Sequence, residues 1–125
     1  MSFSAQPPTS VANLGGIIDR AVILDRVGGD EELLREITAI FLEEYPSLID
    51  EIQAAAGAGD AKRLERAAHS LKGSVSNFGA QGPTQAAYKL ETMGRRGEMQ
   101  EVGSAVDDLL YEFGQLRPAL EDLAS

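Results

Sequence analysis

The sequence predicts an all-α protein, an up-down antiparallel four-helix bundle with a short additional helix at its N-terminal side. Three features of the chain support this fold class. Apolar residues recur at three- and four-residue steps in four long segments, which is the period of an amphipathic helix. The connections between these segments are short, so consecutive helices are expected to run antiparallel. No segment alternates apolar and polar residues at the period of two that is typical of a strand.

The first 16 residues are rich in Ser, Pro, Gln and Gly and show no sustained period. We therefore expect an irregular lead-in over residues 1–16 and a helical bundle domain over residues 17–125. The domain should open with a short helix, for which Asp19 suits the N-cap and the pair Gly28-Gly29 suits the end. The positions of this helix expected to face inward are Ala21, Val22 and Leu24.

A much longer helix should follow. Asp30 suits its N-cap, and two glutamates in its first turn favour the positive end of the helix dipole. Pro46 lies inside this helix and should bend it, because proline removes one backbone hydrogen bond and crowds the preceding turn. The helix should end at Gly57 or Gly59. Its apolar positions are Leu33, Leu34, Ile37, Ile40, Phe41, Tyr45, Leu48, Ile49, Ile52 and Ala56.

The third helix contains the only histidine of the chain, His69. Asp60 suits the N-cap of this helix, which we expect to run to about Phe78 and to stop at Gly79. Its apolar residues fall into one stripe, and His69 falls on a different face. His69 should therefore face solvent or a partner and not the core. The stripe consists of Leu64, Ala67, Ala68, Leu71, Val75 and Phe78.

Two further helices complete the expected bundle. Gly79, Gly82 and Pro83 should form a turn that leads into a shorter fourth helix, and residues 94–97 should form the next turn. The fifth helix keeps a seven-residue apolar repeat, which is typical of neighbours that cross at about 20°. Pro118 lies near its end, where we expect a kink. The inward positions are Ala86, Ala87, Leu90 and Met93 on the fourth helix, and Met99, Val102, Val106, Leu109, Phe113, Leu116, Leu120 and Leu123 on the fifth.

The composition excludes several classes of function. A net charge of −9 argues against nucleic acid or an anionic membrane as a partner. There is no cysteine and only one histidine, and no loop has the spacing of a carboxylate metal site, so we expect neither a metal nor a cofactor. No apolar run approaches the ~20 residues of a membrane span, and the N-terminus lacks the regions of a signal peptide. We expect a cytoplasmic protein.

A polar cluster surrounds His69 on the exposed face of its helix. Lys72 lies one turn away, within reach of an anion held on the imidazole, and Ser76 shares the same face. Gly73 leaves bare backbone beside the ring, although glycine inside a helix costs roughly 0.5–1 kcal/mol relative to alanine. Taken singly, each residue is ordinary on an exposed helix face. The glycine at this one place calls for a reason, and close approach by another molecule supplies one.

The string H-S-L-K-G at residues 69–73 resembles the phosphorylation motif of histidine-containing phosphotransfer (HPt) domains. These domains are small helical bundles that relay phosphoryl groups between receiver domains. The resemblance covers about everything after the first dozen and a half residues. Further segments similar to the family pattern are residues 28–34, 41–46, 78–80 and 90–91.

The resemblance implies a phosphorelay intermediate. His69 would accept a phosphoryl group from a receiver-domain aspartate or a kinase and pass it to another receiver domain. Exposed neutral imidazole is a competent nucleophile toward phosphorus, and Lys72 supplies one positive charge to a reaction that depends on positioning and charge neutralisation. The implied partners are a response-regulator receiver domain and a hybrid sensor kinase. We expect the chain itself to be a monomer.

The chain contains no P-loop, no glycine-rich nucleotide loop and no carboxylate pair set up to hold magnesium. We therefore expect a phosphoryl carrier without its own nucleotide site, and not an enzyme. The resemblance places magnesium in the acidic pocket of the partner receiver domain. The histidine helix is basic within an acidic molecule, which would steer an acidic cleft toward it, and its cations are Lys62, Arg63, Arg66 and Lys72. The alternative for these cations is an ordinary solvated helix face.

Glu91 has two alternative interpretations. Members of the HPt family often carry a glutamine on the following helix that orients the histidine ring through its other nitrogen, and Glu91 stands at the matching place. A carboxylate can accept that hydrogen bond, but it adds negative charge near the phosphoryl group. The alternative is a charge on the exposed surface of the helix.

Two rival functions are weighed against phosphotransfer. One is a non-catalytic acidic helical bundle that only binds a signalling partner, for which His69 would be dispensable. The other is the dimerisation helix pair of a sensor kinase, which also carries an exposed histidine. That family follows its histidine with an acidic residue and a nearby proline, whereas Ser70-Leu71-Lys72-Gly73 follows here. We set the second rival aside.

Overall fold

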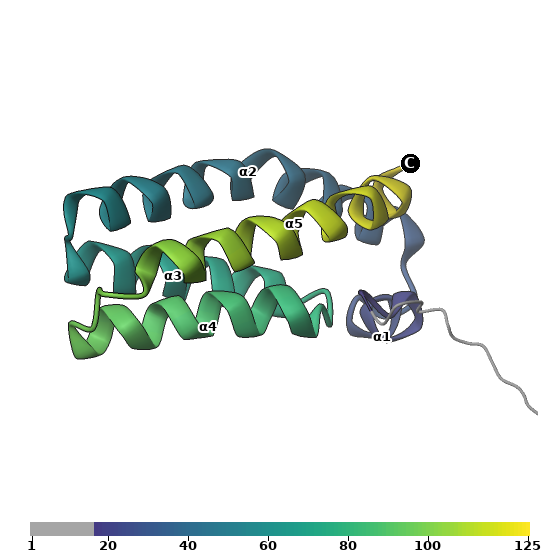
Figure 1. The fold of residues 1–125 in the computed structure, drawn as a ribbon. Helices are drawn as coiled ribbons and strands as arrows, with labels where there is room; N and C mark the ends of the chain where they lie inside the picture. Colours follow the sequence, from purple (N-terminus) through teal and green to yellow (C-terminus); the bar gives the residue numbers. More distant parts are fainter. Residues whose placement is uncertain (1–16) are drawn as a thin grey trace, which may run out of the picture.

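The structure is a computed structural model that describes residues 17–125, so the expected lead-in lies outside the described residues. Four long helices form an up-down bundle, and a short helix lies at one end of it (Figure 1). No strand occurs among the described residues, and the predicted all-α fold is confirmed. The helices are α1 (Arg20–Arg26), α2 (Glu31–Ala58), α3 (Ala61–Ser76), α4 (Gln81–Arg96) and α5 (Val102–Ala124).

The four long helices pack in a closed ring. Helix α2 packs against α3 and α5, and α4 packs against the same two helices from the other side. The contact between α3 and α4 is the most extensive in the molecule, whereas α1 has only a small contact with α2. The largest fully buried side chains of the ring include Leu34, Ile52, Leu64, Leu71, Leu90, Leu109, Leu116 and Leu120.

The N-caps of the first three helices form where the sequence predicts them. Asp19, Asp30 and Asp60 are N-caps, and the carboxylate of each accepts a hydrogen bond from a backbone amide of the first turn. Helix α2 ends at Gly59, whose φ of 65° is a left-handed conformation that glycine adopts without strain. Helix α3 ends at Ser76, slightly before the expected position.

The inward face of α1 and of the start of α2 differs from the prediction. In α1 Ile23 is buried, while Ala21 and Val22 are exposed and Leu24 is half-buried. In α2 the apolar residues Leu33 and Ile40 are exposed. Helix α2 has 28 residues, whereas α3 and α4 have 16 each, so the start of α2 extends past these two helices and only a narrow stripe of it is covered. The buried positions between them are Leu34 and Thr38, and the Thr38 hydroxyl donates to the Leu34 carbonyl at 2.7 Å.

Both internal prolines lie within single helices. Helix α2 contains Pro46 and α5 contains Pro118, and neither helix is interrupted there.

The boundaries of α4 correct two predicted turns. The helix begins at Gln81, so Gly82 and Pro83 lie in its first turn and not in the preceding loop. It continues to Arg96, so residues 94–97 are not a turn as predicted, and Gly97 is the C-cap with a φ of 68°. Gly94 is buried inside the helix. A Cβ atom at this position would lie 2.7 Å from the carbonyl oxygen of Ala61, so Gly94 permits the close approach of α3 and α4.

Candidate functional site

Burial of the apolar stripe of α3 orients the exposed face of this helix. Leu64, Leu71 and Val75 are completely buried against the neighbouring helices, as the sequence predicts. The His69 side chain lies on the opposite side and is 66% exposed. Its ring is therefore accessible to another macromolecule without any rearrangement of the bundle.

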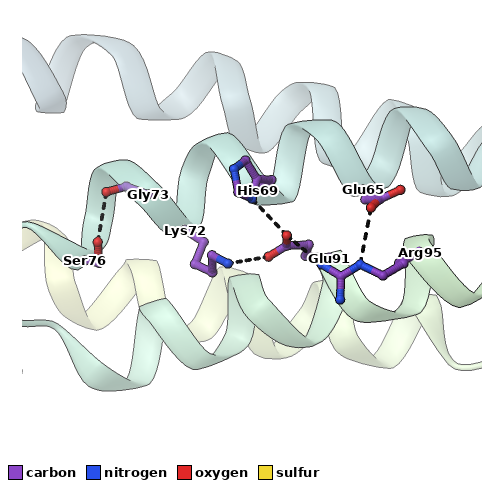
Figure 2. A network of polar contacts seen from close by, with 7 residues as sticks. All are labelled: Glu65, His69, Lys72, Gly73, Ser76, Glu91 and Arg95. Carbon is purple, nitrogen blue, oxygen red and sulfur yellow. Dashed lines mark hydrogen bonds and ion pairs between the residues drawn. The ribbon is translucent and has the colours of Figure 1, made fainter.

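Glu91 on α4 contacts the histidine from the inner side. One of its carboxylate oxygens, Oε2, lies 2.9 Å from Nδ1 of His69 (Figure 2). The Glu91 side chain is only 5% exposed, so the alternative of an exposed surface charge is wrong. An ionised carboxylate can only accept a hydrogen bond, so Nδ1 carries the ring proton in this contact. The lone pair of the other ring nitrogen, Nε2, is then free for chemistry.

Two cations compensate the charge of Glu91. The Lys72 ammonium lies 2.8 Å from Oε1, and Nη2 of Arg95 donates to Oε2 at 2.9 Å. Burial alone would raise the pKa of Glu91, but the contacts with Lys72 and His69 outweigh it and hold the pKa below its ordinary value of 4.5. Glu91 is therefore ionised at neutral pH, which the hydrogen bond to Nδ1 requires.

Lys72 is engaged within the site. Besides its ion pair with Glu91, its ammonium lies 5.2 Å from the centre of the Tyr88 ring on α4, and its side chain is only 27% exposed. The structure thus brings Lys72 together with His69 through the carboxylate they share. A direct contact between Lys72 and a phosphoryl group stays a prediction.

Arg95 is a member of the network that our sequence reasoning missed. It donates to Glu91 on its own helix and also lies 3.4 Å from the carboxylate of Glu65 on α3 (Figure 2). The four-residue spacing between Glu91 and Arg95 was the available signal, because residues at this spacing are neighbours on a helix surface. The contact with Glu65 could not be read from spacing, since it joins two helices.

Gly73 and Ser76 have different surroundings on the same face of α3. A Cβ atom added at Gly73 would meet no atom of residues 17–125 within 4 Å, so this part of the chain leaves the backbone there open. The Ser76 hydroxyl donates to the Gly73 carbonyl at 2.9 Å, and the Ser76 carbonyl accepts from Arg26 of α1 at 3.1 Å. Ser76 thus makes contacts within the molecule, and its predicted role in binding a partner stays untested.

A hollow of about 560 Å³ lies beside the histidine. Lys62 and Arg66, the two cations in its lining, make no ion pair with any described residue. Arg63 was expected to attract an acidic partner together with these two cations. Its guanidinium instead makes a bidentate contact with Glu51 on α2. The residues that line the hollow are Lys62, Glu65, Arg66, His69, Ser70 and Glu91.

Residues 17–125 contain neither a candidate metal site nor a membrane-spanning helix. No group of three or more acidic or histidine side chains is placed to hold a metal ion. None of the helices in this part of the chain has the length and apolar character needed to cross a membrane.

Comparisons with known proteins bear on the family and the fold of this chain. The family model described as Hpt domain matches residues 36–125. A search of curated protein sequences finds no match. Among solved structures, the chain is similar to histidine-containing phosphotransfer protein B (HptB) from Pseudomonas aeruginosa PAO1, with a TM-score of 0.79 and 27% identity over 90% of this chain and 95% of that one.

A second similar structure is the HPT domain from the Hpt sensor hybrid histidine kinase from Shewanella. Its TM-score is 0.74, and the match covers 86% of this chain and 93% of that one. At 18% identity, this likeness bears on the fold alone.

Proposed function

The chain belongs to the Hpt domain family, and from this premise we propose which of its residues carry the phosphoryl group and receive the partner. Like other members, it is a histidine phosphotransfer intermediate of phosphorelays, a carrier of phosphoryl groups and not a classical enzyme. We assign the phosphoryl group to Nε2 of His69. The observation that carries this assignment is that the only histidine is exposed while its Nδ1 is hydrogen-bonded to a buried carboxylate.

The transfer then proceeds in one displacement. The Nε2 lone pair attacks the phosphorus of an aspartyl phosphate, the P–O bond to the aspartate breaks, and its electron pair returns to that carboxylate. The ring keeps its proton on Nδ1 and becomes a phosphorylated imidazolium, whose positive charge Glu91 stabilises at 2.9 Å. Passing the group on reverses these steps, and neutral imidazole leaves.

The partner that fits the exposed face is a receiver domain with an acidic pocket. The bare backbone at Gly73 allows close approach, and the free cations Lys62 and Arg66 attract an acidic surface. We propose the receiver of a response regulator as acceptor and a hybrid sensor kinase as the source of phosphoryl groups. One chain presents the whole face, so we propose that it acts as a monomer. We place it in the cytoplasm.

No cofactor is assigned to this chain, and the magnesium ion of the reaction is placed on the receiver. EDTA should therefore stop transfer to and from the receiver without removing the phosphoryl group from isolated phosphorylated protein. Calorimetry of the protein with magnesium alone provides the opposing test. Tight one-to-one binding by this chain would contradict the proposal, and so would phosphorylation by ATP without a kinase, because we propose that the chain lacks a nucleotide site.

The main experiment mixes the protein with receiver domains that carry a labelled phosphoryl group. A single acid-labile, alkali-stable label should appear on the wild-type protein and none on His69→Ala. The variant should keep its helical content and melting temperature, because an exposed side chain contributes little to stability. Label on His69→Ala would overturn the assignment, and a partner response that needs no histidine would favour the adaptor function.

A further inference from the structure

One oxygen of Glu91 is shared between two donors. Oε2 contacts Nδ1 of His69 and Nη2 of Arg95, each at 2.9 Å. The same arginine lies 3.4 Å from Glu65, so it is held between two carboxylates (Figure 2). The other oxygen, Oε1, is occupied by Lys72. Arg95 and the Nδ1 proton of His69 therefore compete for the negative charge on Oε2, and a stronger contact with Arg95 weakens the attraction of Glu91 for the ring proton.

We propose that Arg95 is a positioning residue that acts through Glu91 to set how strongly the phosphorylated ring of His69 holds its Nδ1 proton, and thereby the pH range in which phosphohistidine gives up its phosphoryl group. The proposal rests on the proposed phosphorylation of His69. Arg95 itself touches neither the ring nor the phosphoryl group; it changes the charge and the hydrogen-bonding capacity that the carboxylate presents to Nδ1.

The chemistry makes the Nδ1 proton decisive. When water or an aspartate attacks the phosphorus, the Nε2–P bond breaks and its electron pair goes to Nε2. With a proton on Nδ1 the leaving group is neutral imidazole, whereas without it the leaving group is an imidazolate anion. The protonated form is therefore the one that reacts. A stronger negative charge beside Nδ1 keeps this form populated to higher pH.

Within residues 17–125, the charged groups around this pair come from α3 and α4 only. Helix α3 contributes Lys62, Glu65, Arg66 and Lys72, and α4 contributes Arg95. Among the described residues, no charged group of α1, α2 or α5 contacts His69 or Glu91. Lys72 and Arg95 both weaken the field of the carboxylate, and Glu65 partly offsets Arg95. Only Arg95 uses the same oxygen as the histidine, so its removal should have the most direct effect on Nδ1.

The test measures spontaneous loss of the phosphoryl group from purified phosphorylated protein as a function of pH, which involves no docking partner. Arg95→Gln should move the alkaline midpoint of the rate profile upward and Glu91→Gln should move it downward, each by ~1 pH unit or less, which is up to about tenfold in rate on the alkaline side. Glu65→Gln, which leaves Arg95 to Glu91 alone, should also move it downward. Arg95→Lys should remain near wild type.

Arg96→Gln is the matched control, because it removes the same charge one residue further along the same turn. Arg96 makes no ion pair within residues 17–125, so its variant should leave the midpoint in place. Midpoints for Arg95→Gln and Glu91→Gln that move in the same direction would overturn the proposal. An Arg95→Gln profile equal to that of Arg96→Gln would do so too. Should Arg95→Gln fail to fold, the downward shift expected for Glu65→Gln and the wild-type midpoint expected for Arg95→Lys test the proposal in its place.

A second readout separates this inference from the proposed function. The chain has one histidine, so its ring nitrogens give a single set of ¹⁵N signals in the unphosphorylated protein. Protonation at Nδ1 should dominate in the wild type and in Arg95→Gln, and decrease in Glu91→Gln. Failure of the wild type to take up a phosphoryl group would sink the proposed function. Normal uptake with unmoved midpoints would sink only the role of Arg95.

Discussion

Two glycines lie about one turn beyond the two partners of the His69–Glu91 contact, and their environments are opposite. Gly73 follows His69 on the outer face of α3, and a Cβ atom there would meet nothing within 4 Å. Gly94 follows Glu91 on α4, and a Cβ atom there would lie 2.7 Å from backbone atoms of Ala61 and Glu65. Both glycines cost their helices the same intrinsic stability.

The difference shows that one residue type serves two purposes at one site. Gly94 brings α3 and α4 close together, which places the Glu91 carboxylate under the histidine. Gly73 keeps the opposite side of α3 bare, and no contact among residues 17–125 requires a glycine there. Because glycine weakens the helix and no internal contact explains it at this position, we infer that a binding partner requires the bare backbone. The partner that we propose is a docking receiver domain.

The substitution Gly73→Gln gives the strongest test of the difference between the two glycines. The variant should melt at or above the wild-type temperature, because the added side chain meets open solvent. Phosphotransfer should slow on the order of 100-fold, since a misplacement of about 1 Å between reacting groups can cost that much. Stopped-flow transfer from a phosphorylated receiver measures the rate. A variant that melts early but transfers normally would make Gly73 a packing residue.

The reciprocal change is Gly94→Ala. Because the new methyl group would meet backbone and not the end of a flexible side chain, α3 and α4 must separate. We expect a loss of about 1–3 kcal/mol in the free energy of unfolding, the usual range for overpacking. Urea unfolding followed by circular dichroism measures it. An unchanged midpoint would mean that the two helices have room to move apart freely.

The matched control for that experiment is Gly73→Ala. The same substitution on the outer face should raise the free energy of unfolding by up to ~1 kcal/mol, because alanine has the higher helix propensity and finds no obstacle. The two alanine variants are thus expected to differ in sign under identical urea titrations. Equal signs would contradict the distinction between the two faces.

The smallest expected effect concerns acid stability on the inner side. The pKa of Glu91 is lowered below 4.5 in the folded protein, so its contribution to stability is fully present above pH 4.5 and is lost as the pH falls through the folded value. The difference in unfolding free energy between wild type and Glu91→Gln should therefore shrink on acidification below pH 4.5. A difference that stays constant down to pH 2 would show that the ion pairs of Glu91 contribute nothing.

The outer face of the site could be predicted from sequence, and much of the inner side could not. Strong apolar periodicity in α3 fixed the phase of that helix, and the exposure of His69 followed from it. The sequence predicts Gly94 in a turn, because glycine near two arginines and Gly97 is typical of a helix end. Its true role depends on the distance to the backbone of another helix, which no local pattern contains.

The same limitation applies to single side chains. The sequence allows two interpretations of Glu91. Leu90 and Glu91 are adjacent on α4 and both are buried, and only the packing of α3 determines that Glu91 is covered. Leu33 and Ile40 were expected inside because they are apolar, yet the number of neighbouring helices at that end of the bundle determines how wide the buried stripe can be. The spacing of Arg95 from Glu91 could be read from the sequence, but its contact with Glu65 joins two helices and could not.

The loose attachment of α1 has a consequence for motion. This helix buries only Ile23, packs slightly on α2, and reaches α3 through one hydrogen bond from Arg26. Its backbone amides should exchange with deuterium through local opening, well before those of the closed ring of four helices. Phe41 and Phe78 line a hollow of about 330 Å³ that α1, α2 and the end of α3 enclose. Each opening of α1 would expose these two rings to water while the network around His69 stays closed.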